Sequence, residues 1–95
     1  MQEIDPSTVF LPRPDVVACE IDSGSALLDL NSSRYFRLNG SASLIWRLIQ
    51  QHVRLSDICQ GVLDHYDVER DRCMADTISV LIAFEKAGLV DREHA

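Results

Sequence analysis

The stretch VVACEIDSGSALLDLNSSRYFRL, residues 16–38, alternates short runs of strand-forming residues with clusters of turn-forming residues. The runs are residues 16–21, 26–30 and 34–38, and they are rich in the branched and aromatic side chains that favour strands. Between them lie DSGS and NSS, whose residue types dominate tight turns, and Gly24 is able to take a positive φ. Three short strands joined by tight turns predict an antiparallel meander.

The hydrophobic period changes directly after this stretch. Asn39, Ser41 and Ser43 are candidate helix N-caps, because a short side-chain oxygen accepts hydrogen bonds from the N–H groups of a helix start. The apolar residues that follow have the spacing of one helix face. They are Leu44, Ile45, Leu48 and Ile49. A first helix is therefore expected here, with Trp46 in the core or at its rim.

Two more helices are expected in the second half of the chain. One begins near Ser56, a good capping residue, and ends near Asp67. The other covers about residues 69–87, and Gly88 suits the left-handed position that follows a helix. Residues 89–90 are expected to return as a short strand or extended tail. Strands followed by helices predict an α+β fold, a three-stranded antiparallel meander followed by three helices in a winged-helix-like arrangement.

Length and composition fit one small domain. The chain has 95 residues, of which 46% are apolar and 25% charged, as is ordinary for globular proteins. Residues 1–14 contain three prolines and are expected to form a flexible N-terminal arm, which leaves residues 15–91 as the domain. No signal-peptide core and no membrane-spanning stretch is visible in the sequence, so a cytoplasmic location and no membrane partner are expected.

The charge and the cysteines weigh against a nucleic-acid-binding protein and against a disulfide-linked fold. The net charge is −6, with nine Lys and Arg against fifteen Asp and Glu, which weighs against a nucleic-acid partner. Cys19, Cys59 and Cys73 have long, unequal spacings and contain no CxxC pair. They are expected to be buried thiols in a reducing compartment.

The third predicted helix carries two apolar stripes, which is more than a surface helix needs. The first consists of Met74, Ile78 and Leu81, and we expect it to face the core. The second consists of Cys73, Thr77, Val80, Phe84 and Ala87. Either the helix is central and has neighbours on both sides, or the second stripe lines an open groove that binds a partner.

The third predicted strand favours the second interpretation, an open groove that binds a partner. In a meander this strand is an edge, and its unpaired backbone groups are a template for another chain. Phe36 and Leu38 should point to one side and help the core, while Tyr35 and Arg37 point to the other. An extended peptide that adds to this edge would place alternate side chains in the groove, which is a recurrent mode of peptide recognition.

Several segments together resemble the PqqD family. They are residues 26–30 (ALLDL), 34–40 (RYFRLNG), 45–46 (IW), 55–66 and 84–90 (FEKAGLV). The resemblance covers about residues 16–90. It implies a recognition element, or peptide chaperone, for ribosomally synthesised and modified peptides. Such an element binds the leader of a precursor peptide and presents it to a leader peptidase or other modifying enzyme. The patterns at residues 27–30 and 34–39 are most similar to the stand-alone lasso-peptide type.

The resemblance also implies which residues bind the leader, with the leader added as a strand to the third strand and packed against the third helix. The strand contacts would be Arg34, Tyr35, Phe36, Arg37 and Leu38. The helix contacts would be Cys73, Asp76, Thr77, Val80 and Phe84.

The sequence contains no constellation that indicates catalysis, a cofactor or a metal. His52, His65 and His94 are far apart, and none has a partner at metal-ligand spacing. A DNA-binding winged-helix regulator is the alternative function, but its reading helix would carry Arg70 and Arg72 only at its start. A second alternative for the strand edge is that it pairs with another copy of the chain.

Overall fold

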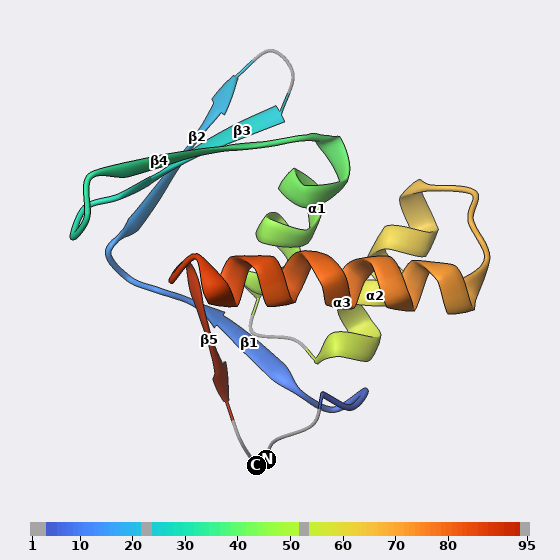
Figure 1. Cartoon of the computed structure of the whole chain (residues 1–95). Coiled ribbons are helices and arrows are strands. Elements are labelled where there is room, and N and C mark those ends of the chain that lie inside the picture. The colour runs from blue at the N-terminus through green and yellow to red at the C-terminus, as the bar shows by residue number, and fades with distance from the viewer. Residues whose placement is uncertain (1–3, 22–23, 52–53, 94–95) are drawn as a thin grey trace.

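The computed structural model describes residues 4–21, 24–51 and 54–93. It contains the predicted antiparallel meander of β2 (Val16–Ile21), β3 (Gly24–Asp29) and β4 (Arg34–Leu38), in the order β2-β3-β4, at the upper left of Figure 1. Three helices follow in the chain, which confirms the predicted α+β class. The order leaves β2 and β4 as the two edges of this sheet.

One face of the meander packs against the helices. Leu27 and Leu38 are buried and form part of the core with residues of α1 (Gly40–Ile49). The neighbouring side chains of Leu28 and Tyr35 are exposed. This alternation is what the two-residue period of a strand requires when one face of a sheet is covered and the other is open to solvent.

The three helices begin and end close to their predicted positions. Asn39 caps α1, because its side-chain oxygen accepts from the backbone N–H of Ala42 at 2.9 Å. The helix α2 spans Leu55–His65 with Arg54 as its N-cap, so the prediction that Ser56 is the cap was wrong. The third helix, α3 (Arg70–Lys86), ends before Gly88, which has φ +78° as its predicted position requires.

A second, two-stranded antiparallel sheet joins β1 (Val9–Pro12) to β5 (Val90–Glu93) below the helices in Figure 1. The expected C-terminal strand is therefore present, whereas β1 lies inside the segment that was predicted as an arm. Phe10 is completely buried, and the Arg92 guanidinium lies 5.6 Å from the centre of its ring. Burial of this one aromatic side chain explains why residues 9–12 dock on the domain.

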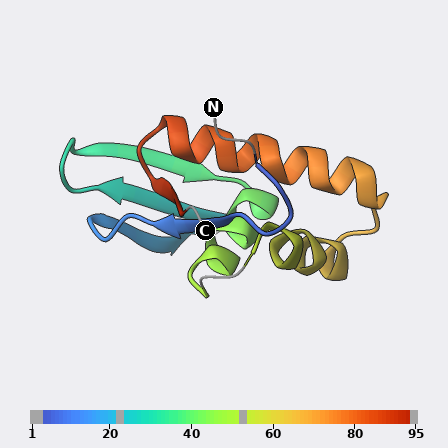
Figure 2. The same cartoon turned by 90° about the horizontal axis from the view of Figure 1, so that it is seen from below.

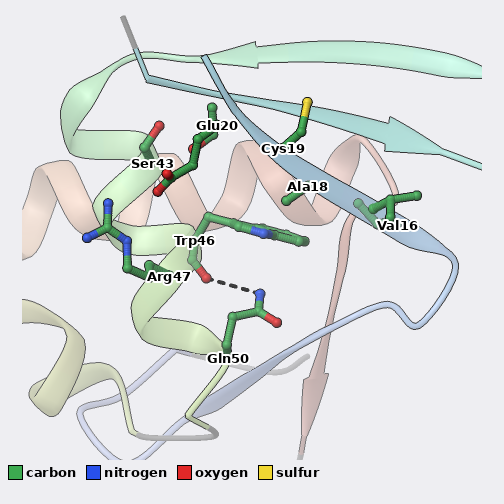
Figure 3. Close-up of a pocket in the computed structure, with 10 residues that line it drawn as sticks. Val16, Ala18, Cys19, Glu20, Ser43, Trp46, Arg47 and Gln50 are labelled. Carbon is green, nitrogen blue, oxygen red and sulfur yellow. Dashed lines mark hydrogen bonds between the residues drawn. The ribbon is translucent and has the colours of Figure 1, made fainter. Parts of the chain in front are cut away.

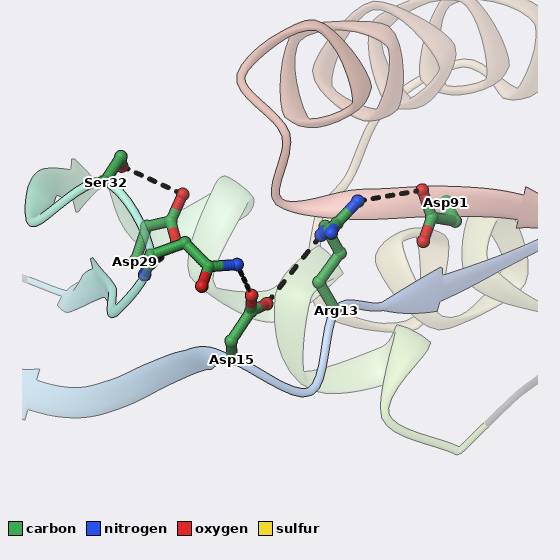
Figure 4. A network of polar contacts seen from close by, with 6 residues as sticks. Arg13, Asp15, Asp29, Ser32 and Asp91 are labelled. Atoms are coloured by element: carbon green, nitrogen blue, oxygen red, sulfur yellow. Dashed lines mark hydrogen bonds and ion pairs between the residues drawn. The ribbon is translucent and has the colours of Figure 1, made fainter.

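Polar contacts connect the two sheets at the joint between β1 and β2 (Figure 4). Arg13 forms ion pairs with Asp15 and, from Nη1 at 3.5 Å, with Asp91 of β5. The Asn31 amide donates to Asp15, and the Asn31 backbone N–H donates to Asp29. That backbone hydrogen bond is the main reason why the pKa of the Asp29 carboxyl lies below its usual value. The β3–β4 turn is thus tied to the rest of the molecule.

In the described ranges, no helix combines the length and the apolar character that crossing a membrane requires.

We expect Gly24→Ala to destabilise the protein. Gly24 has φ +148°, and a Cβ at this position would lie 2.1 Å from the carbonyl oxygen of Leu38. The backbone strain alone should cost about 1–3 kcal/mol, and the collision must be relieved by movement of β4. Urea unfolding measures the loss. Gly88→Ala is the matched control, because Gly88 also has positive φ but open space around it. Equal stability of wild type and Gly24→Ala would contradict this account.

Candidate peptide-binding groove

Both apolar stripes of α3 contain buried residues. Cys73, Thr77 and Phe84 of the second stripe are buried, together with Leu81 of the first. Met74 and Ile78 are only partly buried. The first stripe thus faces the core fully only at Leu81, and the second stripe also contributes to the core, because α3 packs against α1 and α2 through both stripes. Val80 is half-buried, and Asp76 is exposed.

A hollow of about 270 Å³ lies beside the first half of α3. Residues of α1, α2, α3 and the connection between α2 and α3 surround it. They are Ser41, Ile45, Val62, Tyr66, Val68, Cys73, Asp76, Thr77 and Val80. We call this the N-terminal hollow. It is largely apolar, with Asp76 as its charged residue, and Asp76 forms an exposed ion pair with Arg72 at 3.8 Å.

A second hollow, of about 380 Å³, lies between β4 and the other end of α3. Its lining residues are Tyr35, Phe36, Arg37, Leu38, Ala83, Phe84, Ala87 and Leu89. We call this the C-terminal hollow. Figures 1 and 2 show β4 running alongside this half of α3. The two hollows follow one another along α3, and β4, an edge strand of its sheet, lines the C-terminal hollow.

The structure brings nearly all predicted site residues to these hollows. Those of the strand, from Tyr35 to Leu38, line the C-terminal hollow together with Phe84. Cys73, Asp76, Thr77 and Val80 line the N-terminal hollow. Arg34 lines neither of them, and its guanidinium lies 5.1 Å from the centre of the Phe36 ring. Their role in binding a peptide stays a prediction.

Some lining residues were not predicted. Tyr66 and Val68 are 40% and 43% exposed, although both are large and apolar, and they form one wall of the N-terminal hollow. Tyr66 directly follows the amphipathic helix α2, whose apolar residues periodicity assigns to packing, and Val68 stands between charged residues in the connection to α3. Ile45 of α1 and Val62 of α2 are buried residues of the core that also line the hollow.

Trp46 packs against Phe84, one of the residues that line the C-terminal hollow. It is buried, as expected, and meets Phe84 edge to face, with ring centroids 5.7 Å apart and an interplanar angle of 84°. Its backbone carbonyl accepts from the Gln50 side chain at 3.1 Å. On its other side Trp46 faces Val16 and Ala18 of β2 across a third hollow (Figure 3). Because Trp46 is the single tryptophan, its fluorescence reports on the Phe84 side of the groove.

Two of the three cysteines, Cys59 and Cys73, are buried, as predicted, and they lie together, with Cys73 also lining the N-terminal hollow. The sulfur atoms of Cys59 and Cys73 are 3.5 Å apart. Burial raises the pKa of the Cys59 thiol to about 11. Cys19 is exposed, so the prediction that it is buried was wrong. The reason is that Cys19 lies on the edge strand β2, on the side that points away from α1 (Figure 3).

This difference predicts selective alkylation. At pH 8 only about a thousandth of Cys59 would be thiolate at a pKa of about 11. We expect iodoacetamide to label Cys19 alone in the folded protein, and to label Cys59 and Cys73 only in urea. Peptide mass spectrometry after a timed reaction measures this. Labelling of Cys59 as fast as that of Cys19 in the folded protein would contradict the buried state.

Of the three histidines, only His65 lies in the part of the chain that the structure describes. His65 is exposed, and its Nδ1 lies 3.1 Å from the carbonyl oxygen of Gly61 in the same helix. His52 and His94 lie outside the described residues. No group of three or more His, Cys, Asp or Glu able to hold a metal ion occurs within residues 4–21, 24–51 and 54–93.

An uncovered strand edge beside an apolar groove is the arrangement used by domains that bind peptides through strand addition. Residues 24–90 match the family model described as coenzyme PQQ synthesis protein D (PqqD). The chain therefore belongs to the PqqD family. No curated protein sequence matches it significantly.

Two solved structures are similar to the chain over most of its length. One is described as lasso peptide synthetase B1 complexed with the leader peptide. It is 28% identical, has a TM-score of 0.79, and the match covers 86% of this chain and 96% of that one. The other is TbiB1 in complex with the TbiA(beta) leader peptide, at 28% identity and a TM-score of 0.81. That match covers 90% of this chain and 98% of TbiB1.

Proposed function

We propose that this protein is a non-catalytic recognition element that binds the leader of a ribosomally synthesised precursor peptide and presents it to a modifying enzyme. The observation that carries the proposal is the terminal position of β4 in its sheet, directly beside the C-terminal hollow. The leader would add to β4 as an antiparallel or parallel strand. Its alternate side chains would enter the hollows along α3.

Because the hollows are largely apolar, the leader residues that enter them should be apolar as well. Large apolar or aromatic leader side chains fit walls made by Ile45, Val62 and Val80 in one hollow and Phe36 and Phe84 in the other. Each leader side chain that is fully buried in this way contributes about 1.5–3 kcal/mol to the binding free energy. Three anchors give roughly 5–9 kcal/mol before the cost of ordering the peptide, which is compatible with micromolar or tighter binding.

The two similar structures support the lasso-peptide subtype, since both hold leader peptides and one is named as a lasso peptide synthetase component. The modifying enzyme would then be a leader peptidase. In this scheme the protein performs no chemistry itself and raises the local concentration of precursor at the enzyme.

The DNA-binding alternative has little support in the structure. Arg70 donates to the side chain of Gln60 at 3.0 Å, and Arg72 pairs with Asp76. The centre of α3 is packed against α1 and α2, so it does not present a row of polar side chains to a groove of DNA.

Titration separates the two functions. A synthetic leader peptide of the precursor encoded beside this protein is added while Trp46 fluorescence is followed, and duplex DNA is added in a parallel experiment. We expect saturable leader binding with a Kd on the order of micromolar or lower. Salt-sensitive DNA binding without leader binding would contradict the proposal.

A further inference from the structure

Cys59 has no part in the proposed leader binding, yet its thiol is in contact with that of Cys73 on the neighbouring helix. The Cys59 thiol donates to the Cys73 sulfur at 3.5 Å, and both side chains are buried. The Cys73 sulfur is also 3.6 Å from the carbonyl oxygen of Cys59 and 3.9 Å from Oγ1 of Thr77. These contacts hold the two sulfur atoms beside each other, so a disulfide can form once an oxidant reaches one of them.

Only one of the two cysteines lines a hollow. Cys73 lines the N-terminal hollow, whereas Cys59 does not. That hollow, at about 270 Å³, has room for several water-sized molecules, and hydrogen peroxide is such a molecule. Burial raises the pKa of the Cys59 thiol to about 11, so Cys59 by itself reacts poorly with an oxidant. A small oxidant therefore meets Cys73 first, with Cys59 directly behind it.

We propose that Cys59 and Cys73 are a modification site, at which a reversible disulfide forms in the leader-free protein and weakens leader binding. This rests on the proposed leader binding and adds to it a control by peroxide. Thiols are kept reduced in the reducing compartment that the sequence predicts, so the dithiol is the resting form there. The disulfide forms when peroxide is supplied, and a thiol reductant reverses it.

Hydrogen peroxide balances the reaction. The Cys73 thiolate attacks one peroxide oxygen and the O–O bond breaks, which gives a sulfenic acid on Cys73 and one hydroxide. The Cys59 sulfur then attacks the sulfenic sulfur, so that an S–S bond forms and a second hydroxide leaves. The two thiol protons convert the two hydroxides to water. The sulfur atoms together lose two electrons, and the peroxide oxygens take up both.

The disulfide should narrow the N-terminal hollow. Its sulfur atoms have to be about 2.05 Å apart, so α2 and α3 approach each other at this point. Val62 lies one turn after Cys59 on α2, and Thr77 lies one turn after Cys73 on α3. Both line the hollow, so a large leader side chain would fit less well after oxidation. A leader side chain already in the hollow would cover Cys73 and hold the helices apart. Leader binding and disulfide formation therefore oppose each other.

The test uses Cys19→Ser in the full chain, because Cys19 is exposed and would otherwise form disulfides between copies. The protein is treated with hydrogen peroxide, catalase removes the excess, and non-reducing peptide mass spectrometry identifies the product. We expect a disulfide between Cys59 and Cys73 that dithiothreitol removes. Leader affinity, measured by Trp46 fluorescence, should fall at least about tenfold on oxidation and recover after dithiothreitol. Saturating leader should slow disulfide formation at least about tenfold.

The matched control is Cys19→Ser with Cys59→Ala, which keeps Cys73 but has no second thiol. After peroxide treatment it should accumulate a sulfenic acid on Cys73, which dimedone labels, and no disulfide. Circular dichroism verifies its fold. The reversal by dithiothreitol is measured on Cys19→Ser alone, so it decides the question even if the control does not fold.

Absence of the disulfide after peroxide treatment would overturn the proposal. So would a disulfide that leaves leader affinity unchanged, or one that forms equally fast when leader saturates the protein. Failure of the reduced protein to bind the leader would contradict the proposed function itself, and with it the coupling. Disulfide formation in the leader-free protein is measured without any leader, so the two failures are distinguishable.

Discussion

Replacing Val80 with Asp is expected to weaken leader binding by at least about 100-fold while the protein stays folded. Val80 is half-buried and forms part of the wall of the N-terminal hollow. An apolar leader side chain that enters the hollow would cover the new carboxylate and leave it without a partner. Asp76, which lines the same hollow, adds like-charge repulsion and no compensation. Burial of an unpaired polar group costs roughly 2–7 kcal/mol, which is enough for the expected loss.

The control for Val80→Asp is Ser79→Asp. Ser79 precedes Val80 in α3 but is exposed, so this variant adds the same charge to the same helix outside the hollow. Leader affinity of Ser79→Asp should equal that of wild type. Fluorescence titration of both variants, with circular dichroism to verify the fold, gives the comparison. Normal leader binding by a folded Val80→Asp variant would show that the N-terminal hollow is not part of the site.

Replacing Phe84 with Ala is expected to lower the free energy of unfolding by about 3–5 kcal/mol. Phe84 is only 5% exposed and packs edge to face against Trp46, so its removal leaves a cavity between α1 and α3. That loss is a large part of the stability of a small domain, which is typically about 5–15 kcal/mol. Urea unfolding followed by Trp46 fluorescence measures it. Met74→Ala, at a partly buried position of the same helix, should cost less.

Phe84 therefore differs from Val80 as a probe of the groove. Both belong to one stripe in the sequence, but burial makes Phe84 mainly a core residue whose outer surface borders the C-terminal hollow. A loss below about 1 kcal/mol for Phe84→Ala would contradict its place in the core.

The strands and helices followed from local patterns because each is decided by its own residues. The alternation in residues 34–38 and the turn residues on either side of 26–30 are sufficient for a meander with β4 at one edge. The capping oxygen of Asn39 and the glycine at position 88 set the start of α1 and the end of α3 within their own neighbourhoods.

The features that were missed depend on contacts between distant residues. β1 has four residues and pairs with β5, at the other end of the chain, so the local sequence VFLP gives little sign of it. Periodicity shows that α3 is apolar on two sides but not which neighbour covers each side, and the burial of Cys73 and Thr77 depends on where α1 and α2 pack. Tyr66 and Val68 reach the N-terminal hollow only because α2 and α3 lie side by side.

Strand addition to β4 is the central claim, and N-methylation of the leader tests it most directly. A series of synthetic leaders, each with one backbone N-methyl group at successive positions, is titrated against the protein by Trp46 fluorescence. Because only every second N–H of an added strand faces β4, binding should fall at least about tenfold at alternate positions and change little between them. Losses that recur every three to four residues, or no losses at all, would show that the leader does not bind as a strand.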